Sequence, residues 1–269
     1  MGLPLGGFPP IGKVPTLPSI GEGANWLVDG ATAIADRLKL PHSQLYDEWA
    51  STRDSRTWPE PPSGNGRPAM LIPGFLAGDP SLSSMARWLK KGGWEVSRSG
   101  INWNVDCTQA TVEAVEQRLE AAVAEAGEKA LLVGQSRGGA MGKVIAVRRP
   151  DLVSTLVTLG SPLNDHFDFH PRVWFGIGVI GGLGELGFPG FLSRDCATGD
   201  CCSETRIAYS RPFPDEVRFI SFYSRGDTIV RYQACLHNSA EQIEIGSSHL
   251  GMGFDSEVWV RMAELLQDR

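Results

Sequence analysis

Gly134-Gln135-Ser136-Arg137-Gly138 stands between a strand-like segment and a helix-like segment of the sequence. The residues just before it, 130–133, are all apolar, which is typical of a short buried strand. Residues 137–149 carry apolar side chains at the spacing of one helix face. A Gly-x-Ser-x-Gly pattern at such a turn is a nucleophile elbow, in which a sharp bend exposes the serine hydroxyl at the end of the strand. The pattern therefore predicts that Ser136 is a nucleophile.

A serine nucleophile needs a general base, and His249 is the best placed of the five histidines. Residues 242–245 alternate polar and apolar side chains as a half-buried strand does, and His249 lies in the turn that follows. A helix is expected to begin near Asp255. His249 therefore stands on the loop after the last strand, where we expect the base. His237 lies in a less regular stretch and is the weaker candidate.

The base needs a carboxylate that orients it, and two aspartates are candidates. Asp227 follows 219–223, a strand-like run with aromatic and β-branched residues, and the short turn 224–226. Asp165 follows the strand-like segment that precedes this one along the chain. Some hydrolases take their acid from that position, so both aspartates stay open, with Asp227 preferred.

Attack on a carbonyl also needs two backbone amides to stabilise the negative oxygen. The amide of Arg137, directly after the nucleophile, is one expected donor. Residues 69–72 form a second strand-like run, and Gly74 lets the backbone turn directly after it. The amide of Phe75 is the other expected donor, with that of Leu76 as the alternative. Asp79 is expected to cap the helix that follows.

These motifs together resemble the α/β-hydrolase superfamily, and within it the lipase-like and esterase-like serine hydrolases. The resemblance spans about residues 66–268 and rests on the elbow, the Ser-Asp-His order and the loop Pro73-Gly74-Phe75-Leu76-Ala77-Gly78. That loop is also similar to the one in a set of uncharacterised actinobacterial hydrolases. Many lipases have histidine where this chain has Gln135, and His-Gly where it has Pro73-Gly74. These departures count against assignment to the lipases more than against assignment of the fold.

Strand-like and helix-like segments alternate along the chain, which indicates a mainly parallel sheet flanked by helices. We therefore expect the α/β-hydrolase fold, with a cap or lid insertion between the strand that leads to Gly160 and the strand that carries Phe219. Residues 61–269 are the expected hydrolase domain, with the insertion over 162–214. Residues 1–60 are the expected N-terminal extension, with a helix near 26–40. The carboxyl ends of parallel strands are where such sheets bind ligands.

The insertion contains an apolar, glycine-rich stretch over residues 174–192. Its glycines and Pro189 make a membrane-spanning helix a poor interpretation, so we predict no transmembrane segment. A hydrophobic cap that buries the greasy part of a substrate fits better, although a permanently packed flap stays open. Two interpretations of Trp103 also stay open: its side chain either lines the substrate pocket or belongs to the core. The predicted substrate-binding residues are Leu76, Trp103, Trp174, Phe175, Ile177, Phe188 and Phe191.

Three of the five cysteines cluster in the insertion, at Cys196, Cys201 and Cys202. No second ligand pair at zinc spacing accompanies them, so the spacing does not predict a zinc site. A disulfide between Cys196 and one of the other two stays open. Asp165, His166, Asp168 and His170 are more typical of polar residues at the root of a cap than of metal ligands. We therefore predict no metal and no cofactor.

The composition limits the class of partner. A net charge of −6 argues against nucleic acid. The first residues lack the basic and apolar regions of a secretory signal, so a cytoplasmic location is expected. The apolar fraction of 42% is sufficient for a sizeable core. Nothing in the sequence predicts an oligomeric state.

Taken together, the motifs predict hydrolysis of carboxylic esters that have a hydrophobic acyl part, through a Ser136-His249-Asp227 triad and an acyl-enzyme. An acyltransferase or a thioesterase would use the same triad, with the acceptor decided by how well water is excluded. A protein of another class, which binds a hydrophobic ligand without converting it, is the remaining alternative. Acyl length and the alcohol part of the substrate are left open.

Overall fold

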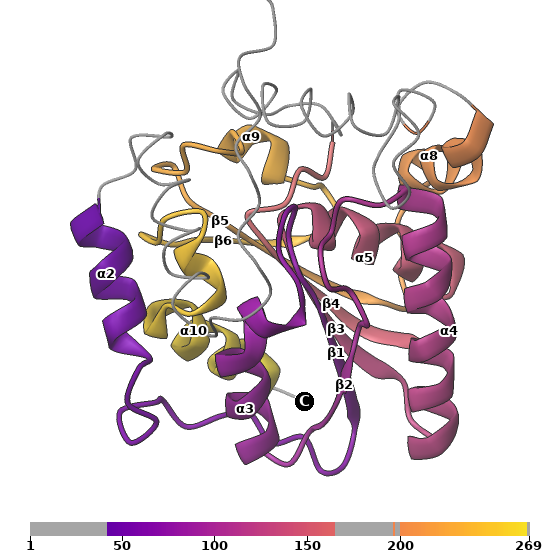
Figure 1. Ribbon diagram of the computed structural model, residues 1–269. Helices are drawn as coiled ribbons and strands as arrows, with labels where there is room; N and C mark the ends of the chain where they lie inside the picture. The colour runs from indigo at the N-terminus through magenta and orange to yellow at the C-terminus, as the bar shows by residue number, and fades with distance from the viewer. Residues whose placement is uncertain (1–41, 165–195, 197–199, 268–269) are drawn as a thin grey trace, which may run out of the picture. The chain divides into compact units, whose positions relative to one another are not determined.

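The computed structural model describes residues 42–164, 196 and 200–267 (Figure 1). The chain divides into two units, residues 1–39 and 40–269, and every described residue belongs to the second unit. The helices and strands in chain order, with η for a 3-10 helix, are α2 (His42–Ser51), β1 (Pro68–Ile72), η1 (Asp79–Leu82), α3 (Ser83–Lys91), β2 (Glu95–Arg98), α4 (Thr108–Ala126), β3 (Ala130–Gln135), α5 (Arg137–Arg148), β4 (Val153–Leu159), η2 (Asp200–Cys202), α8 (Ser203–Ser210), β5 (Arg218–Tyr223), α9 (Tyr232–Cys235), β6 (Glu241–Glu244), η3 (Gly251–Gly253) and α10 (Ser256–Gln267).

The strands form one six-stranded sheet in the order β2-β1-β3-β4-β5-β6. All neighbouring pairs are parallel, which confirms the expected parallel sheet flanked by helices. The chain first moves from β1 to β2 and then returns to the other side of β1 for β3. The loops after β1 and β3 therefore diverge at a switch in strand order, where open α/β sheets bind ligands. Ile72 pairs with Gly134 at this point, so the two loops begin side by side.

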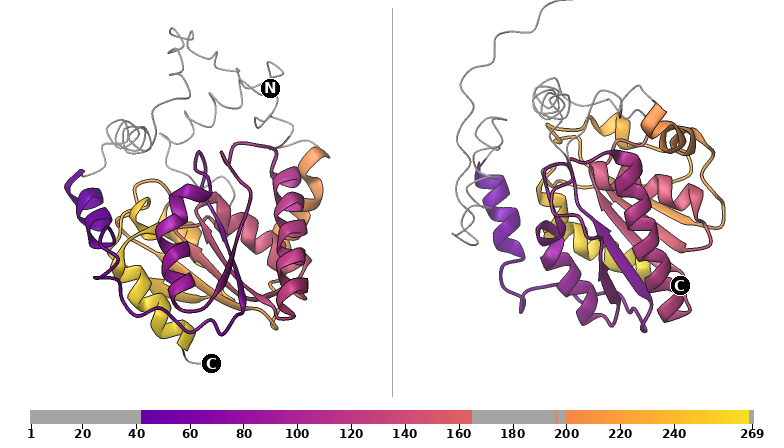
Figure 2. Two further views of the ribbon diagram at one scale, coloured as in Figure 1. Left: turned by 60° about the horizontal axis from the view of Figure 1, so that its bottom comes forward. Right: turned by 45° about the vertical axis from the view of Figure 1, so that its right-hand side comes forward.

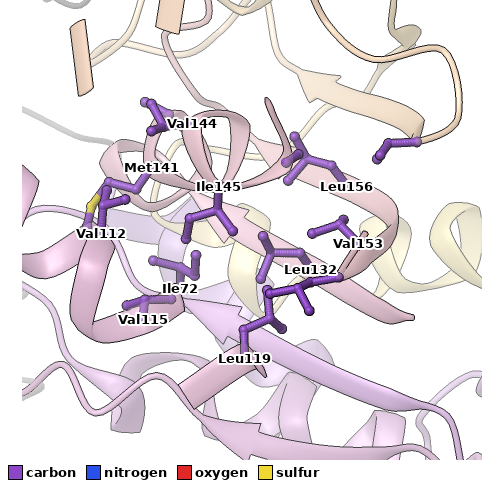
Figure 3. Close-up of a cluster of buried hydrophobic side chains, with 14 of the residues drawn as sticks. Ile72, Val112, Val115, Leu119, Leu132, Met141, Val144, Ile145, Val153 and Leu156 are labelled. Atoms are coloured by element: carbon purple, nitrogen blue, oxygen red, sulfur yellow. The ribbon is translucent and has the colours of Figure 1, made fainter. Parts of the chain in front are cut away.

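One face of the sheet packs against α4, α5 and α8 (Figure 1). Successive side chains of a strand point to opposite faces, so Ile72 and Leu132 meet these helices while Leu71 and Val133 do not. Figure 3 shows the helical side chains that cover this face. They include Val112, Val115 and Leu119 of α4 and Met141, Val144 and Ile145 of α5.

The other face packs against α3 and α10, and the left view of Figure 2 shows the sheet between yellow α10 and magenta α4. Trp88 of α3 and Trp259 of α10 stack with their ring centroids 5.2 Å apart, and both are fully buried. Helices on both faces bury the central strands completely, which is why β1 and β3 are continuous apolar runs without polar alternation.

Some expectations differ from the structure or fall outside it. The 3-10 helix η1 directly precedes α3. Asp79 does not cap a helix. Its carboxylate instead accepts hydrogen bonds from the Ser99 hydroxyl (2.5 Å) and the Gly100 amide (3.0 Å). Helix α2 was not predicted. The expected helix near 26–40 and the apolar stretch 174–192 lie outside the described residues. Within the described residues, each helix is too short or too polar to cross a membrane.

Candidate active site

Ser136 occupies the bend between β3 and α5 with φ 51° and ψ −122°. A positive φ is costly for a residue with a Cβ, by about 1–3 kcal/mol, and such strain persists only where the surroundings enforce it. The turn is so tight that a Cβ on Gly134 would lie 2.4 Å from Cα of Gly139. The Ser136 amide donates to the carbonyl of Leu159 in β4 (2.8 Å), which holds the bend against the neighbouring strand. The expected elbow geometry is therefore present.

Asp227 and His249 form a close pair at the carboxyl end of β5 and β6. Nδ1 of His249 lies 2.6 Å from Oδ2 of Asp227, and the two side chains are only 4% and 1% exposed. The second carboxylate oxygen, Oδ1, accepts hydrogen bonds from the amides of Ile229 (2.8 Å) and Val230 (2.9 Å). Two backbone amides therefore fix the orientation of the Asp227 carboxylate, and its other oxygen faces Nδ1 of His249.

The residues Leu159 and Gly160 connect the elbow to this pair. The Leu159 carbonyl accepts from the Ser136 amide, and a Cβ on the next residue, Gly160, would lie 3.1 Å from Nδ1 of His249 and 3.2 Å from Oδ2 of Asp227. Gly160 also has φ 55°, so a side chain is excluded there by both space and conformation. The structure thus brings Ser136, Asp227 and His249 to one edge of the sheet. Asp165, the alternative acid, lies outside the described residues.

Gln135 has a role that the sequence did not indicate. Its side chain is buried, and Nε2 donates to the carbonyls of His249 (3.1 Å) and Leu250 (3.3 Å). The residue before the nucleophile therefore ties the elbow directly to the loop that carries the histidine. In the sequence it was visible only as a departure from the histidine of many lipases.

Glu48 of α2 was also missed. It is buried, and its carboxylate accepts hydrogen bonds from the amide and the hydroxyl of Ser248, both at 2.5 Å. Gly251 approaches so closely that a Cβ there would lie 2.0 Å from Oε2 of Glu48. Ser248 precedes His249, so Glu48 holds the histidine loop at a residue next to those that Gln135 contacts. No local motif marks a contact between residues 200 positions apart.

The loop after β1 passes directly over the nucleophile. A Cβ on Gly74 would lie 3.3 Å from Cβ of Ser136 and 3.4 Å from the Gln135 carbonyl. Ala77 donates to the Gly74 carbonyl (3.2 Å), which closes a turn around Phe75. Among the described residues, no protein acceptor pairs with the Phe75 amide. The Arg137 amide opens α5 and so has no acceptor within that helix. Two amides with unused donors thus flank Ser136.

The side chain of Arg137 turns away from the elbow and binds the loop before α4. It donates to the carbonyls of Asn104 (2.6 Å) and Asp106 (2.6 Å) and to the hydroxyl of Thr108 (3.0 Å). Burial lowers the pKa of Arg137 to about 10, while Asp106 acts in the opposite direction. The guanidinium therefore stays charged at neutral pH and fixes the start of α5 to residues 104–108.

Leu76 and Trp103 are the two predicted substrate-binding residues that the structure describes. They are 37% and 48% exposed and lie on neighbouring loops. The Asn104 amide donates to the Ala77 carbonyl (2.9 Å), which joins these loops. An apolar surface therefore borders the Gly74 turn. The other predicted residues lie outside the described part of the chain: Trp174, Phe175, Ile177, Phe188 and Phe191.

His237, the weaker candidate for the base, lies elsewhere. Its ring packs against Phe219 with the centroids 5.3 Å apart, in the amino-terminal half of β5 and away from the elbow. Burial, with a smaller contribution from the nearby Lys143, lowers the pKa of His237 to about 4. A group with so low a pKa is a poor base at neutral pH.

Comparison with known proteins identifies the fold. A mature lipase from Bacillus licheniformis superimposes with a TM-score of 0.57 and 15% identity, over 76% of this chain and 94% of that one. A monoacylglycerol lipase from Paleococcus ferrophilus gives 0.52 and 15%, over 77% and 96%. An α/β-hydrolase enzyme from a lagoon-sediment metagenome from Mar Chica, Morocco, gives 0.50 and 17%, over 76% and 91%. No protein-family model and no curated protein sequence matches the chain. The chain has the α/β-hydrolase fold, as the elbow indicated.

Proposed function

We propose that this protein hydrolyses carboxylic esters through an acyl-enzyme formed on Ser136. The observation that carries the proposal is the buried 2.6 Å contact between His249 and Asp227, on loops tied by hydrogen bonds to the strained elbow of Ser136. A strained serine on the same sheet edge as an imidazole oriented by a carboxylate supports the proposal, because such an imidazole activates a serine hydroxyl that it reaches. The similarity of the fold to lipases and esterases adds support, although fold alone does not define a reaction.

In the first half of the reaction, Nε2 of His249 takes the proton of the Ser136 hydroxyl as the oxygen attacks the ester carbonyl. Asp227 stabilises the imidazolium that forms and remains ionised. The carbonyl oxygen becomes negative, and the amides of Phe75 and Arg137 donate to it. Collapse of this intermediate expels the alcohol, which receives the proton from His249 and leaves an acyl ester on Ser136.

In the second half, water replaces the alcohol. His249 accepts a proton from the water, which attacks the acyl carbonyl, and the same two amides hold the negative oxygen. Return of the proton to the Ser136 oxygen releases the carboxylic acid. Because each step uses the same groups, removing any one of them impairs both halves of the reaction.

The exposed side chains of Leu76 and Trp103 favour an ester with an apolar acyl part. Leu76 lies on the loop that supplies the Phe75 amide. When the carbonyl oxygen of an ester accepts a hydrogen bond from this amide, the acyl chain next to it would run along the apolar surface. Burial of each additional methylene contributes about 0.8 kcal/mol. We therefore expect kcat/KM to rise with acyl length until the apolar surface is filled.

A fluorophosphonate probe and a panel of chromogenic esters test the proposal together. The probe should label the purified full chain once, at Ser136, and the esters should be hydrolysed faster as the acyl chain lengthens from acetate. Failure of a folded protein to label or to turn over any ester would favour a binder and contradict the proposal. Transfer of most acyl groups to an added alcohol, with little free acid, would instead assign an acyltransferase.

Glu48→Ala should lower kcat by about 100-fold, because displacement of a catalytic group by about 1 Å has that order of effect. The substitution leaves the Ser248 amide without its acceptor and opens space beside Gly251. We expect KM to change little, since Glu48 contacts the histidine loop and not the substrate. Steady-state kinetics with a chromogenic ester measure both constants.

Glu48→Gln and Asp47→Ala are the matched variants for this prediction. The glutamine amide keeps an acceptor for the Ser248 amide and a donor for its hydroxyl, so most activity should return. Asp47 is exposed on the same helix, and its removal should have no effect. Equal losses in Glu48→Ala and Glu48→Gln would contradict a positioning role that depends on these two hydrogen bonds.

A further inference from the structure

Four cysteines from distant parts of the sequence meet beside the amino terminus of α4. Cys107 directly precedes α4, and the other three belong to the connection between β4 and β5: Cys196, Cys201 and Cys202. Their sulfur atoms all lie within 4.8 Å of one another. The sequence showed only the cluster in the connection, because Cys107 is separated from Cys202 by 95 positions. The fold thus supplies the fourth ligand that the spacing lacked.

Two of the six sulfur–sulfur distances are close to those of a tetrahedral metal site, and all six are within 4.8 Å. Sγ of Cys107 lies 3.6 Å from Sγ of Cys202, which in turn lies 3.7 Å from Sγ of Cys201. Four sulfurs that each lie about 2.3 Å from a central zinc ion are about 3.8 Å apart along the edges of the tetrahedron. A disulfide requires about 2.05 Å, and none joins the cysteines of this structure.

Hydrogen bonds hold the same two parts of the chain together next to the sulfurs. Oε1 of Gln109, in the first turn of α4, accepts from the amide of Thr205 (3.1 Å) and also from its hydroxyl, in the first turn of α8. Cys202 occupies the N-cap position of that helix and is 1% exposed. Cys107 and Cys202 therefore stand at the starts of α4 and α8, two helices that are joined by hydrogen bonds. Four cysteine ligands suit a structural site, which has no open position for a substrate.

The charge around the cluster also fits. Four thiolates and one divalent ion leave a net charge of −2, which a nearby cation would offset. The guanidinium of Arg137 donates hydrogen bonds on both sides of Cys107, to the carbonyl of Asp106 and to the hydroxyl of Thr108. These hydrogen bonds hold a cation against the residues that flank Cys107.

We propose that Cys107, Cys196, Cys201 and Cys202 bind one zinc ion, which joins the returning end of the β4–β5 connection to the start of α4. Arg137 links this site to the elbow, because its side chain binds the loop that carries Cys107 while its amide follows Ser136. The zinc would be structural: it would take no part in the reaction but would hold the loop that orients Arg137. This inference is independent of the proposed esterase activity.

Metal analysis of the full chain, produced without a histidine tag in zinc-supplemented medium, tests the proposal. We expect about one zinc per chain by mass spectrometry of the elements, falling to near zero in Cys107→Ser and in Cys202→Ser. Cys235→Ser is the matched control: Cys235 is buried but outside the cluster, and its variant should keep the zinc. Absence of metal with two thiols lost to a disulfide, or iron in place of zinc, would overturn the assignment.

Cobalt keeps the test decisive if the serine variants do not fold. Wild-type protein that is stripped of zinc and reloaded with Co²⁺ should show the intense visible bands of tetrahedral thiolate coordination. Zinc should displace the cobalt and raise the midpoint of thermal unfolding relative to the stripped protein. A colourless cobalt form, or equal melting of the stripped and zinc-loaded proteins, would also overturn the proposal.

Discussion

Ser136→Ala is expected to lower kcat for ester hydrolysis by about 10⁴- to 10⁶-fold, because removal of the nucleophile of a triad disables the unit as a whole. The remaining activity would come from direct attack of water on the ester carbonyl, whose developing negative oxygen the two backbone amides still stabilise. Binding should survive, since the apolar surface around Leu76 is untouched. Single-turnover and steady-state assays on the best ester of the panel measure the loss.

The substitution should leave stability nearly unchanged. Alanine keeps the Cβ of Ser136, so the strain of φ 51° is the same in both proteins, and loss of one hydroxyl changes the unfolding free energy by about 1 kcal/mol or less. Ser136→Gly removes the Cβ and with it much of the strain. We expect the glycine variant to be as inactive as the alanine variant and at least as stable.

Ser154→Ala is the matched control. Ser154 is also a strand-associated serine, but its hydroxyl bonds the Ala130 carbonyl (3.0 Å) at the amino-terminal edge of the sheet, away from the elbow. Full activity in this variant would show that the assay responds to position and not to serine content. A Ser136→Ala protein that keeps more than about a tenth of wild-type kcat would exclude Ser136 as the nucleophile.

The sequence predicted the central sheet well because its strands are buried on both faces. Residues 69–72 and 130–133 were expected as strands and lie within β1 and β3, and the elbow was expected where the structure has the bend between β3 and α5. Continuous apolar runs and a Gly-x-Ser-x-Gly turn are local signals, which a single sequence displays. Asp227 was preferred over Asp165, and the structure pairs Asp227 with His249, while Asp165 lies outside the described residues.

The parts that the sequence did not predict depend on contacts between distant segments. Glu48 meets Ser248 across 200 positions, and Cys107 meets Cys202 across 95. Gln135 was noticed as an unusual residue, but its partners are backbone carbonyls, which have no sequence signature. Asp79 was expected to cap a helix because aspartate often does, whereas the neighbouring turn at Ser99 offered its carboxylate two donors. Tertiary partners override such local preferences.

Asp227→Asn is expected to lower kcat by about 10⁴-fold through a change of tautomer. Oδ1 of Asp227 accepts hydrogen bonds from two backbone amides, so an asparagine must place its carbonyl oxygen there. Its NH₂ group then faces Nδ1 of His249, at the position where the carboxylate oxygen now lies 2.6 Å away. An NH₂ group donates, so Nδ1 becomes the acceptor and the ring proton moves to Nε2.

With the proton on Nε2, His249 cannot take the proton of Ser136, although every side chain stays in place. The fold should therefore be intact, and a fluorophosphonate probe should label the variant far more slowly than the wild type. Asp151→Asn is the control for the same change of side chain, at an exposed aspartate paired with Arg149 near the start of β4. Wild-type rates of labelling and hydrolysis in Asp227→Asn would show that another group orients the histidine. Asp165 would then be the next carboxylate to replace.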